Sequence, residues 1–281
     1  MKIVITMTSW KKRINFIGKF IYHFMTTQTV KPDLFYLWLA EEEFPNKEKD
    51  LPEDLLVACD YFKIKLCWIK DNEGPFKRYY TFFNHYDDMV ISIDDDIIND
   101  QNTIKAVLDK YNKNPIPQII HYCGCGGKIC IKNGIEYTIG NRPIFEYDIT
   151  NYYMARSAVA PKSFPLEAFT KDMIKLRKEI CPICDESWIH PFLIKNNIPI
   201  TFIFGLKWTE VSEIQSVGIK HNLHFNLVDI EGKQYKRADI YKYIVLKSIP
   251  ELQESWKKAF PNYDFDYFKI SVEELLKIIK K

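Results

Sequence analysis

Apolar residues in the first 115 positions follow two alternating spacings. Short, nearly unbroken apolar runs, typical of buried strands, occupy residues 2–8, 34–40, 64–69 and 89–94. Segments in which apolar residues recur every three or four positions, as on one face of a helix, occupy residues 14–27, 52–62, 75–86 and 101–111. Helices placed between short buried strands indicate parallel pairing. The sequence therefore predicts an α/β domain, with a mixed, mostly parallel sheet flanked by helices.

The pattern is less regular after residue 115. Residues 114–139 predict short strands with glycine turns, residues 185–197 a helix despite Pro191, and residues 198–204 another strand. From about Gly232 the chain is rich in lysine and predicted to be helical. We therefore expect one domain over residues 1–231, with a helical C-terminal segment, residues 232–281, packed on it.

Charge and composition narrow the class of protein. The 281 residues are 47% hydrophobic, and 39 basic residues face 37 acidic ones, so the chain can build a core and has no charge excess for nucleic acid. No run approaches the roughly 18 apolar residues of a membrane span. Residues 1–10 read as a first strand rather than a signal peptide, which predicts a cytoplasmic protein with reduced cysteines. The amphipathic, basic-tipped residues 270–281 either cap the fold or contact the inner face of the plasma membrane.

Three consecutive aspartates, Asp94–Asp96, follow the apolar run of residues 89–93. Ligands of open α/β sheets bind outside the carboxyl ends of the strands. On an extended chain Asp94 and Asp96 would point to one side and Asp95 to the other. Two carboxylates on one side suit Mg²⁺ or Mn²⁺ together with a diphosphate. The alternative is a solvated loop whose Asp100 caps the next helix, which leaves the triplet unexplained.

Several stretches, taken in order, resemble the bacterial GT-A-fold glycosyltransferases of capsule and lipopolysaccharide biosynthesis. They are ITMTSWKKRI, LFYLWLAEEEFP, LPEDL, GPFKRYYTFF, ISIDDDI and CPICDESWIHPF. The resemblance covers most of residues 1–226. It implies a GT-A fold, a nucleotide-sugar donor and a divalent metal, and does not single out one sugar.

The resemblance also assigns roles to the aspartate motif. It gives Asp96 and Asp94 to the metal, and Asp94, with Asp95 beside it, to the donor. A later histidine often completes the metal site in this family, which points to His221 rather than His224. A structural histidine is the alternative, although imidazole is a common metal ligand.

Other residues are implied to contact the nucleotide or its diphosphate: Thr8, Ser9, Lys12 or Arg13, Asp71, Lys77 and Arg78. Each cation has an ordinary alternative, a solvated basic turn at residues 12–13 and a surface helix face at residues 77–78. Asp71 has one as well, because it lies in the turn sequence KDNEGP.

An acid pair before a tryptophan, Asp185, Glu186 and Trp188, matches the acceptor side of the family's site. The resemblance makes Asp185 the general base that deprotonates the acceptor hydroxyl in an inverting transfer. The alternatives are an acid favoured by the helix dipole and a tryptophan that packs in the core.

Five cysteines fall in two clusters, and those of the first depart from the family's pattern: Cys123, Cys125 and Cys130, then Cys181 and Cys184. Their spacing allows a structural zinc site, whereas buried free thiols are the simpler interpretation.

Together these features predict a hexosyltransferase-like glycosyltransferase that uses Mn²⁺ or Mg²⁺ and a nucleotide sugar, UDP-linked by expectation. The acceptor would be a glycan or lipid-linked sugar in surface polysaccharide synthesis. Two alternatives stay open: a nucleotidyltransferase acting on a nucleoside triphosphate, and a non-catalytic glycan-binding protein on the same fold.

Overall fold

A computed structural model describes residues 1–122, 127–132, 135–139, 151–152, 156–211 and 227–280. The chain divides into two compact units that interleave along the sequence. The first comprises Met1–Gly124, Ala155–Phe164 and Thr201–His221, and the second Cys125–Met154, Pro165–Ile200 and Asn222–Lys281. The expected boundary after residue 231 does not coincide with this division, and it stays a prediction.

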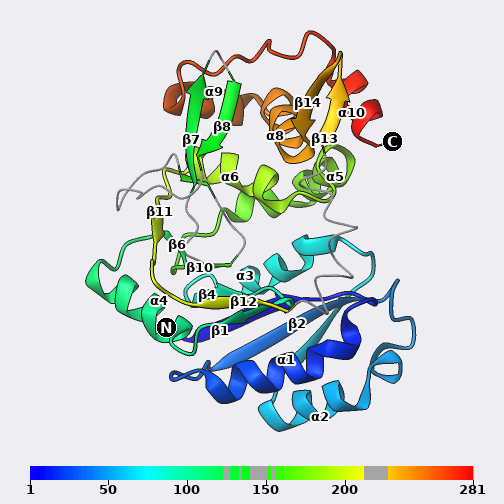
Figure 1. Ribbon diagram of the computed structural model, residues 1–281, viewed down its shortest axis with the longest axis vertical. Coiled ribbons are helices and arrows are strands. Elements are labelled where there is room, and N and C mark those ends of the chain that lie inside the picture. The colour runs from blue at the N-terminus through cyan, green and yellow to red at the C-terminus, as the bar shows by residue number, and fades with distance from the viewer. Residues whose placement is uncertain (123–126, 133–134, 140–150, 153–155, 212–226, 281) are drawn as a thin grey trace. The chain divides into compact units, whose positions relative to one another are not determined.

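A seven-stranded sheet forms the centre of the first unit (Figure 1). Its strand order is β11 (Ile200–Phe202), β6 (Ile119–His121), β10 (Ser157–Val159), β4 (Met89–Ser92), β1 (Ile3–Thr8), β2 (Leu34–Ala40) and β3 (Lys65–Ile69). The pairs β4–β1, β1–β2 and β2–β3 are parallel, whereas β10 runs antiparallel to both β4 and β6. The predicted mixed and mostly parallel sheet is confirmed.

Successive side chains of a strand point to opposite faces of the sheet, and helices pack on both faces. Ile5 and Met7 join the core beneath α1 (Ile14–Thr27), α2 (Glu53–Phe62) and α4 (Thr103–Lys113). On the opposite face, Thr6 Oγ1 donates to the carbonyl oxygen of Arg78 at 2.9 Å. That face carries the 3₁₀ helix η2 (Gly74–Tyr80) and α3 (Thr81–Asn84), where the sequence predicted a single helix. A further 3₁₀ turn, η1 (Lys47–Asp50), lies between β2 and α2.

Helices α1 and α2 approach each other closely at Gly18. A Cβ atom at this position would lie 2.7 Å from the backbone nitrogen of Leu55. The two backbones can come this close because the side chain of Gly18 is a single hydrogen atom, and a larger side chain would not fit between them.

Beyond β4 the chain turns at the aspartates and enters β5 (Ile97–Asn99). This strand pairs antiparallel with β12 (Trp208–Glu210), which ties the aspartate turn to a distant part of the chain. The backbone nitrogen of Val211 donates to the carbonyl oxygen of Asp96 at 3.0 Å and extends that link.

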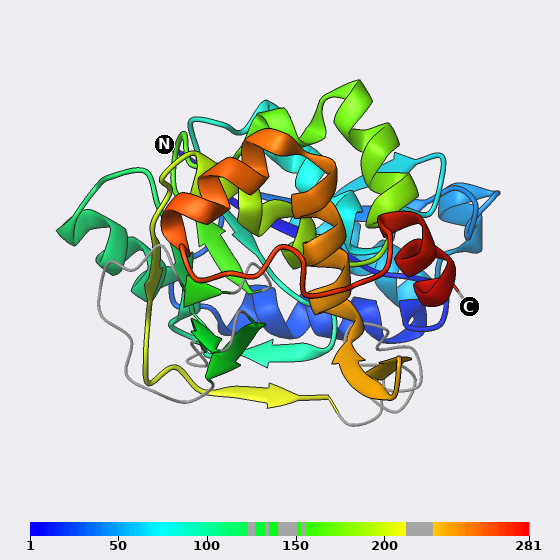
Figure 2. The ribbon, with the colours of Figure 1, turned by 90° about the horizontal axis from the view of Figure 1, so that it is seen from above.

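The second unit is mainly helical. Its helices are η3 (Leu166–Phe169), α5 (Lys171–Ile180), α6 (Asp185–Lys195), α8 (Arg237–Ser248), α9 (Pro250–Ala259) and α10 (Val272–Ile279). Its strands are β7 (Gly127–Lys132), β8 (Ile135–Ile139), β9 (Asn151–Tyr152), β13 (Leu227–Ile230) and β14 (Lys233–Lys236). The antiparallel ladders are β8–β7–β9 and β13–β14. Helices α8 and α9 meet at a sharp bend (Figure 2), and the predicted helical C-terminal segment is confirmed.

The start of that helical segment was predicted incorrectly. Residues 227–236 form a hairpin, and the first C-terminal helix begins only at Arg237. Glu231 and Gly232 have φ values of 53° and 78°, and two successive positive φ values are typical of the tight turn that suits a two-residue hairpin. A right-handed helix therefore cannot include Glu231 and Gly232.

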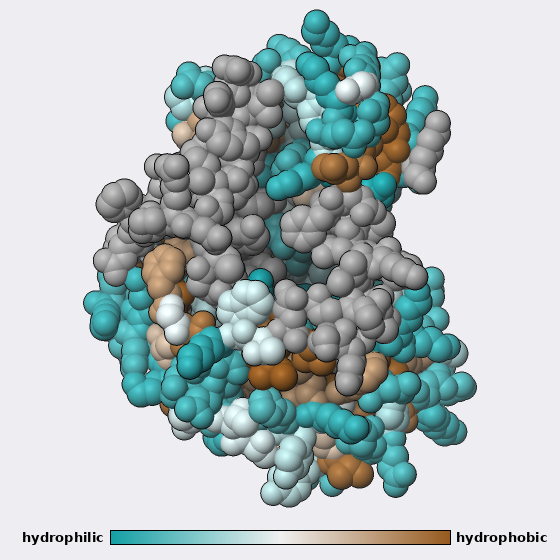
Figure 3. All heavy atoms as spheres, viewed as in Figure 1, coloured by the Kyte–Doolittle hydropathy of each residue, from teal (hydrophilic) through white to brown (hydrophobic). Residues whose placement is uncertain are grey.

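Hydrophobic residues lie in small groups among hydrophilic ones on the described part of the face shown in Figure 3. Within the described residues, no helix combines the length and apolar character that crossing a bilayer requires.

Candidate functional site

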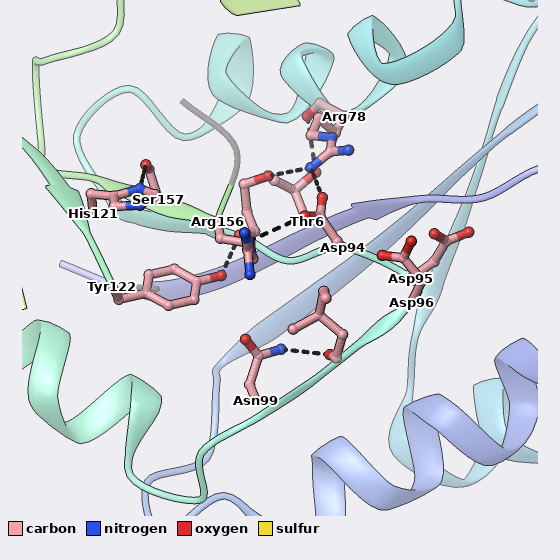
Figure 4. A network of polar contacts seen from close by, with 12 residues as sticks. Thr6, Arg78, Asp94, Asp95, Asp96, Asn99, His121, Tyr122, Arg156 and Ser157 are labelled. Atoms are coloured by element: carbon pink, nitrogen blue, oxygen red, sulfur yellow. Dashed lines mark hydrogen bonds and ion pairs between the residues drawn. The ribbon is translucent and has the colours of Figure 1, made fainter. Parts of the chain in front are cut away.

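A network of charged side chains lies at the carboxyl ends of β1 and β4 (Figure 4). Arg78 Nη1 donates to Asp94 Oδ1 at 2.8 Å and to Ser92 Oγ at 3.0 Å. Arg156 Nε lies 3.7 Å from Asp94 Oδ2. Asp94 thus sits between two guanidinium groups, one that precedes it in the chain and one that follows about 60 residues later.

Asp95 and Asp96 share a third arginine. Arg13 Nη1 lies 2.5 Å from Asp95 Oδ1, and Arg13 Nη2 lies 3.0 Å from Asp96 Oδ2. Ser9 Oγ donates to the other oxygen of Asp95 at 2.7 Å. The loop after β1 therefore supplies the hydrogen bonds that Ser9 and Arg13 donate to Asp95.

The expected side-to-side alternation of the aspartates is not observed. Figure 4 shows Asp94 directed toward Arg78, with Asp95 and Asp96 together and apart from it. The reason is that β4 ends at Ser92 and residues 95–96 form a turn, so the two-residue repeat of an extended strand no longer applies.

Burial and neighbouring charges shift the pKa values of Asp94 and Asp96 in opposite directions. Burial acts to raise the pKa of Asp94, but Arg78 and Arg156 outweigh it and hold that pKa below its usual range. For Asp96 burial comes first, neighbouring Asp94 and Asp95 add to it, and Arg13 does not compensate, so its pKa is raised to about 6. Of Asp94 and Asp96, Asp96 is therefore the one whose ionised form an added positive charge would stabilise more.

Lys77, a predicted diphosphate contact, lies in a second polar group of the same unit. Its Nζ donates to Asn72 Oδ1 at 2.9 Å and lies 3.9 Å from Glu43 Oε2, with 1% of the residue exposed. Burial lowers the pKa of Lys77 and raises that of Glu43. Lys77 is thus a buried cation, and the alternative of an exposed helix face does not apply to it.

The other predicted nucleotide residues have different surroundings. Thr8 is buried, and its Oγ1 donates to the carbonyl oxygen of Trp38 at 2.9 Å. Asp71 is exposed in the bend after β3, where Asn72 rather than Asp71 accepts the turn hydrogen bond from Gly74. The structure therefore brings Ser9 and Arg13 to the aspartates, whereas Thr8 is engaged with β2.

Sequence analysis did not identify Arg156 or Trp208 as candidate site residues. Arg156 precedes the short antiparallel strand β10, with a positive φ of 55°, and its guanidinium stacks 5.0 Å from the centre of the Trp208 ring. Tyr122 is also part of the network, and its hydroxyl donates to the carbonyl oxygen of Ser92 at 2.5 Å. These residues reach the site through long-range strand pairing, which no local motif signals.

Asp185 lies in the second unit as the first residue of α6 and is 4% exposed. Trp188 is fully buried in that unit, its Nε1 donates to the carbonyl oxygen of Ala168 at 3.0 Å, and its ring packs near Phe192. This environment agrees with the core-packing alternative for Trp188.

The described cysteines resemble buried thiols more than metal ligands. Burial raises the pKa of Cys181 and of Cys184. Cys181 Sγ donates to the carbonyl oxygen of Cys184 at 3.2 Å, and Ser187 Oγ donates to Cys184 Sγ at 3.1 Å. Protonated thiols bind zinc poorly. Cys123, Cys125, His221 and His224 lie outside the described residues, as does the side chain of Cys130.

A preassembled metal cage is absent from the described residues, since no three His, Cys, Asp or Glu side chains group there as ligands. A divalent ion would instead be bound by one or two aspartates, with oxygens of a diphosphate and of water. The raised pKa of Asp96 fits such a ligand.

No protein-family model matches the chain, and no curated protein matches it. Among solved structures, the chain is similar to S. aureus TarS 1–349, with 13% identity, 98% of this chain and 77% of that chain covered, and a TM-score of 0.46. It is also similar to Mycobacterium tuberculosis glucosyl-3-phosphoglycerate synthase in complex with Mn²⁺, UDP and glucosyl-3-phosphoglycerate (7% identity, 84% and 86% covered, TM-score 0.42). A third similar structure is Francisella tularensis 2-C-methyl-D-erythritol 4-phosphate cytidylyltransferase (12% identity, 78% and 98% covered, TM-score 0.42). Since these TM-scores are below 0.5, we base no inference about this chain on them.

Proposed function

We propose that the protein is a metal-dependent glycosyltransferase that moves a sugar from a nucleotide sugar to a glycan or lipid-linked acceptor. One observation carries the proposal: Asp94–Asp96 lie at the carboxyl ends of parallel strands, and arginines contact all three carboxylates. Carboxylates bind a divalent ion, and guanidinium groups bind phosphate oxygens. The two kinds of group together match a metal–diphosphate complex.

The metal, Mn²⁺ or Mg²⁺, would be held by Asp96 and Asp94, with His221 as a further candidate from the family resemblance. Bound there, it would neutralise charge on the departing diphosphate. Asp95 has a different task in this proposal, because both of its oxygens already accept hydrogen bonds, from Arg13 and Ser9. Asp95 orients those two residues toward the nucleotide.

Other residues of the first unit would bind the donor. Lys77 offers a buried positive charge for the diphosphate. Thr8 and Asp71, which follow from the family resemblance alone, are proposed to line the nucleotide. We propose a UDP-linked sugar as the donor.

Asp185 is proposed as the general base of an inverting transfer. A base must accept the proton of the acceptor hydroxyl as the new glycosidic bond forms. What supports this role is the position of Asp185 as a buried acid at the start of α6, next to Glu186. If Asp185 has no such role, Glu186 is the next candidate.

The acceptor is proposed to belong to a surface polysaccharide such as capsule or lipopolysaccharide, assembled on the cytoplasmic side of the plasma membrane. Peripheral contact with that membrane would rest on the exposed lysines at the C-terminal end of α10, Lys277 and Lys280, because the apolar residues Leu275 and Ile279 of this helix are buried within the protein.

The test is turnover of a panel of nucleotide sugars by the purified protein, with Mn²⁺ and with a chelator. We expect one donor to release its nucleotide diphosphate only with metal, and Asp96→Asn to abolish that release. A thermal-shift screen identifies the donor first, since a ligand at about 100 times its Kd adds about 2.7 kcal/mol of stability.

The same assay tests the two alternatives. A nucleotidyltransferase is the second candidate, because the same carboxylates and guanidinium groups could hold the metal–triphosphate complex that such an enzyme uses. That enzyme would release pyrophosphate from a nucleoside triphosphate. A glycan-binding protein would bind metal or sugar and turn over no donor.

A further inference from the structure

Among the described side chains that form ion pairs at the aspartate turn, negative and positive charges are equal in number. Asp94–Asp96 contribute three negative charges, and Arg13, Arg78 and Arg156 contribute three positive ones. The contacts are unevenly distributed, since Asp94 lies near two guanidinium groups and Asp96 contacts Arg13 alone among these arginines. A metal ion at Asp96 would therefore compete with Arg13.

We infer that Arg13 exchanges partners during ligand binding. It holds Asp96 while the metal is absent and turns to the nucleotide diphosphate when the metal takes Asp96. The inference rests on the proposed function, because it takes the donor to bring a diphosphate. Arg13 is thus a positioning residue for the aspartates and a binding residue for the diphosphate.

The contacts of Arg13 make this exchange possible. Its two terminal nitrogens contact different carboxylates, Nη1 with Asp95 and Nη2 with Asp96. Asp95 is itself fixed by Ser9, so Arg13 can release Asp96 and keep one anchor. A guanidinium group binds carboxylate and phosphate oxygens with the same fork of donors, so the freed Nη2 suits a phosphate oxygen.

Charge balance gives the exchange a thermodynamic consequence. A metal ion alone adds two positive charges to a balanced cluster and leaves Arg13 beside the ion. A diphosphate that binds without a metal ion is repelled by the three carboxylates of Asp94–Asp96. Bound together, the two ligands cancel most of each other's charge, and Nη2 of Arg13 gains a phosphate oxygen in place of Asp96. Metal and diphosphate should therefore strengthen each other's binding, and this coupling is reciprocal by linkage.

A purely structural Arg13 would behave differently. If it only held the turn in shape, its loss would weaken metal binding with and without nucleotide by the same factor. An exchanging Arg13 competes with the metal when no nucleotide is present and assists it when nucleotide is bound. Opposite effects in the two conditions therefore distinguish the two roles.

The experiment is calorimetric titration of Mn²⁺ into the full chain, alone and at saturating UDP, for wild type, Arg13→Gln and Arg13→Lys. Lys11→Gln is the matched control, because Lys11 is an exposed cation in the same turn and its side chain has no bond to the aspartates in the described structure. Circular dichroism and thermal melting in chelator check that each variant folds.

We expect Arg13→Gln to bind Mn²⁺ alone several-fold more tightly than wild type. The factor by which UDP increases the affinity for Mn²⁺ should be about tenfold smaller in this variant, within the usual range of coupling. Arg13→Lys retains the charge without the fork, so it should bind Mn²⁺ alone nearly as wild type does and show reduced coupling. Lys11→Gln should match wild type in both titrations. If Arg13→Gln does not fold, the Arg13→Lys titrations decide the question by themselves.

Equal weakening of Mn²⁺ binding by Arg13→Gln with and without UDP would overturn the exchange and leave the proposed function standing. Wild-type protein that binds neither Mn²⁺ nor UDP with Mn²⁺ would overturn both. Wild-type coupling that survives unchanged in Arg13→Gln and Arg13→Lys would show that metal–phosphate contact alone produces it.

Discussion

Replacing Asp96 by asparagine should stabilise the metal-free protein at neutral pH, and the gain should disappear in acid. The pKa of Asp96 is raised from 3.8 to about 6 by burial and by neighbouring Asp94 and Asp95. The folded state thus keeps this proton to a higher pH than the unfolded chain does. Wild-type stability therefore falls as pH rises from about 4 to about 6 and stays lower above that range. Asparagine resembles the protonated carboxyl and cannot ionise.

The size of the effect follows from the difference between the two pKa values. A difference of about two pKa units corresponds to about 3 kcal/mol at 1.36 kcal/mol each. Solvent screening reduces this little, because the Asp96 side chain is only 17% exposed. The attraction of Arg13 is already included, since the raised pKa is the net result of all neighbours. We therefore expect Asp96→Asn to gain up to about 3 kcal/mol over wild type between pH 4 and pH 8.

The assay is urea unfolding followed by tryptophan fluorescence, in chelator, at pH steps from 4 to 8. Wild type and Asp96→Asn are compared at each pH, with Asp60→Asn as a control, since Asp60 is a surface aspartate with 88% of its side chain exposed. The control should change stability little at any pH. A difference between wild type and Asp96→Asn that is constant with pH, or that favours wild type at pH 7 to 8, would refute the electrostatic reasoning.

Three further predictions concern other parts of the chain. Asp185→Asn should fold, bind donor and metal, and lose at least about a hundredfold in transfer rate, and near-normal transfer would remove the proposed base. Purified protein should hold no stoichiometric zinc by elemental analysis, because burial keeps Cys181 and Cys184 protonated, whereas one zinc per chain that is lost in Cys181→Ser would contradict this. Gly18→Ala should cost about 1–3 kcal/mol in unfolding experiments, since its Cβ would lie 2.7 Å from a backbone atom of α2, and exposed Lys19→Ala should cost far less.

The sequence predicted strands β1 to β4 and helices α1, α2 and α4 because local pattern determines those elements. Residues 3–8, 34–40 and 65–69 are short apolar runs, and helix α1 spans the residues whose spacing predicted it. The hairpin at residues 227–236 was missed because each strand has only four residues and the second, KQYK, is polar, so the apolar alternation is too short to stand out.

The candidate site was predictable in part. Asp94–Asp96 were identified because adjacent carboxylates after a buried strand have no role in a core. Arg13 and Arg78 were candidates because the family resemblance implied cations at these positions for the nucleotide diphosphate. Arg156 was not, because its approach to Asp94 depends on the antiparallel pairing of β10 with β4, and a single arginine before a three-residue strand has no local signature.

The strand order also has a consequence for the protein during its synthesis. Arg13 and Arg78 precede the aspartates, so both are already present when Asp94–Asp96 leave the ribosome. Arg156 follows about 60 residues later, which at about 5–20 residues per second is a delay of roughly 3–12 s. During that delay β4 has no β10 beside it, and one edge of the growing sheet is open. A nascent chain stopped between residues 100 and 150 should therefore be more prone to pair with other chains than one extended past residue 165. Arg156, the last guanidinium of the cluster, directly precedes β10, the strand that covers this edge of β4.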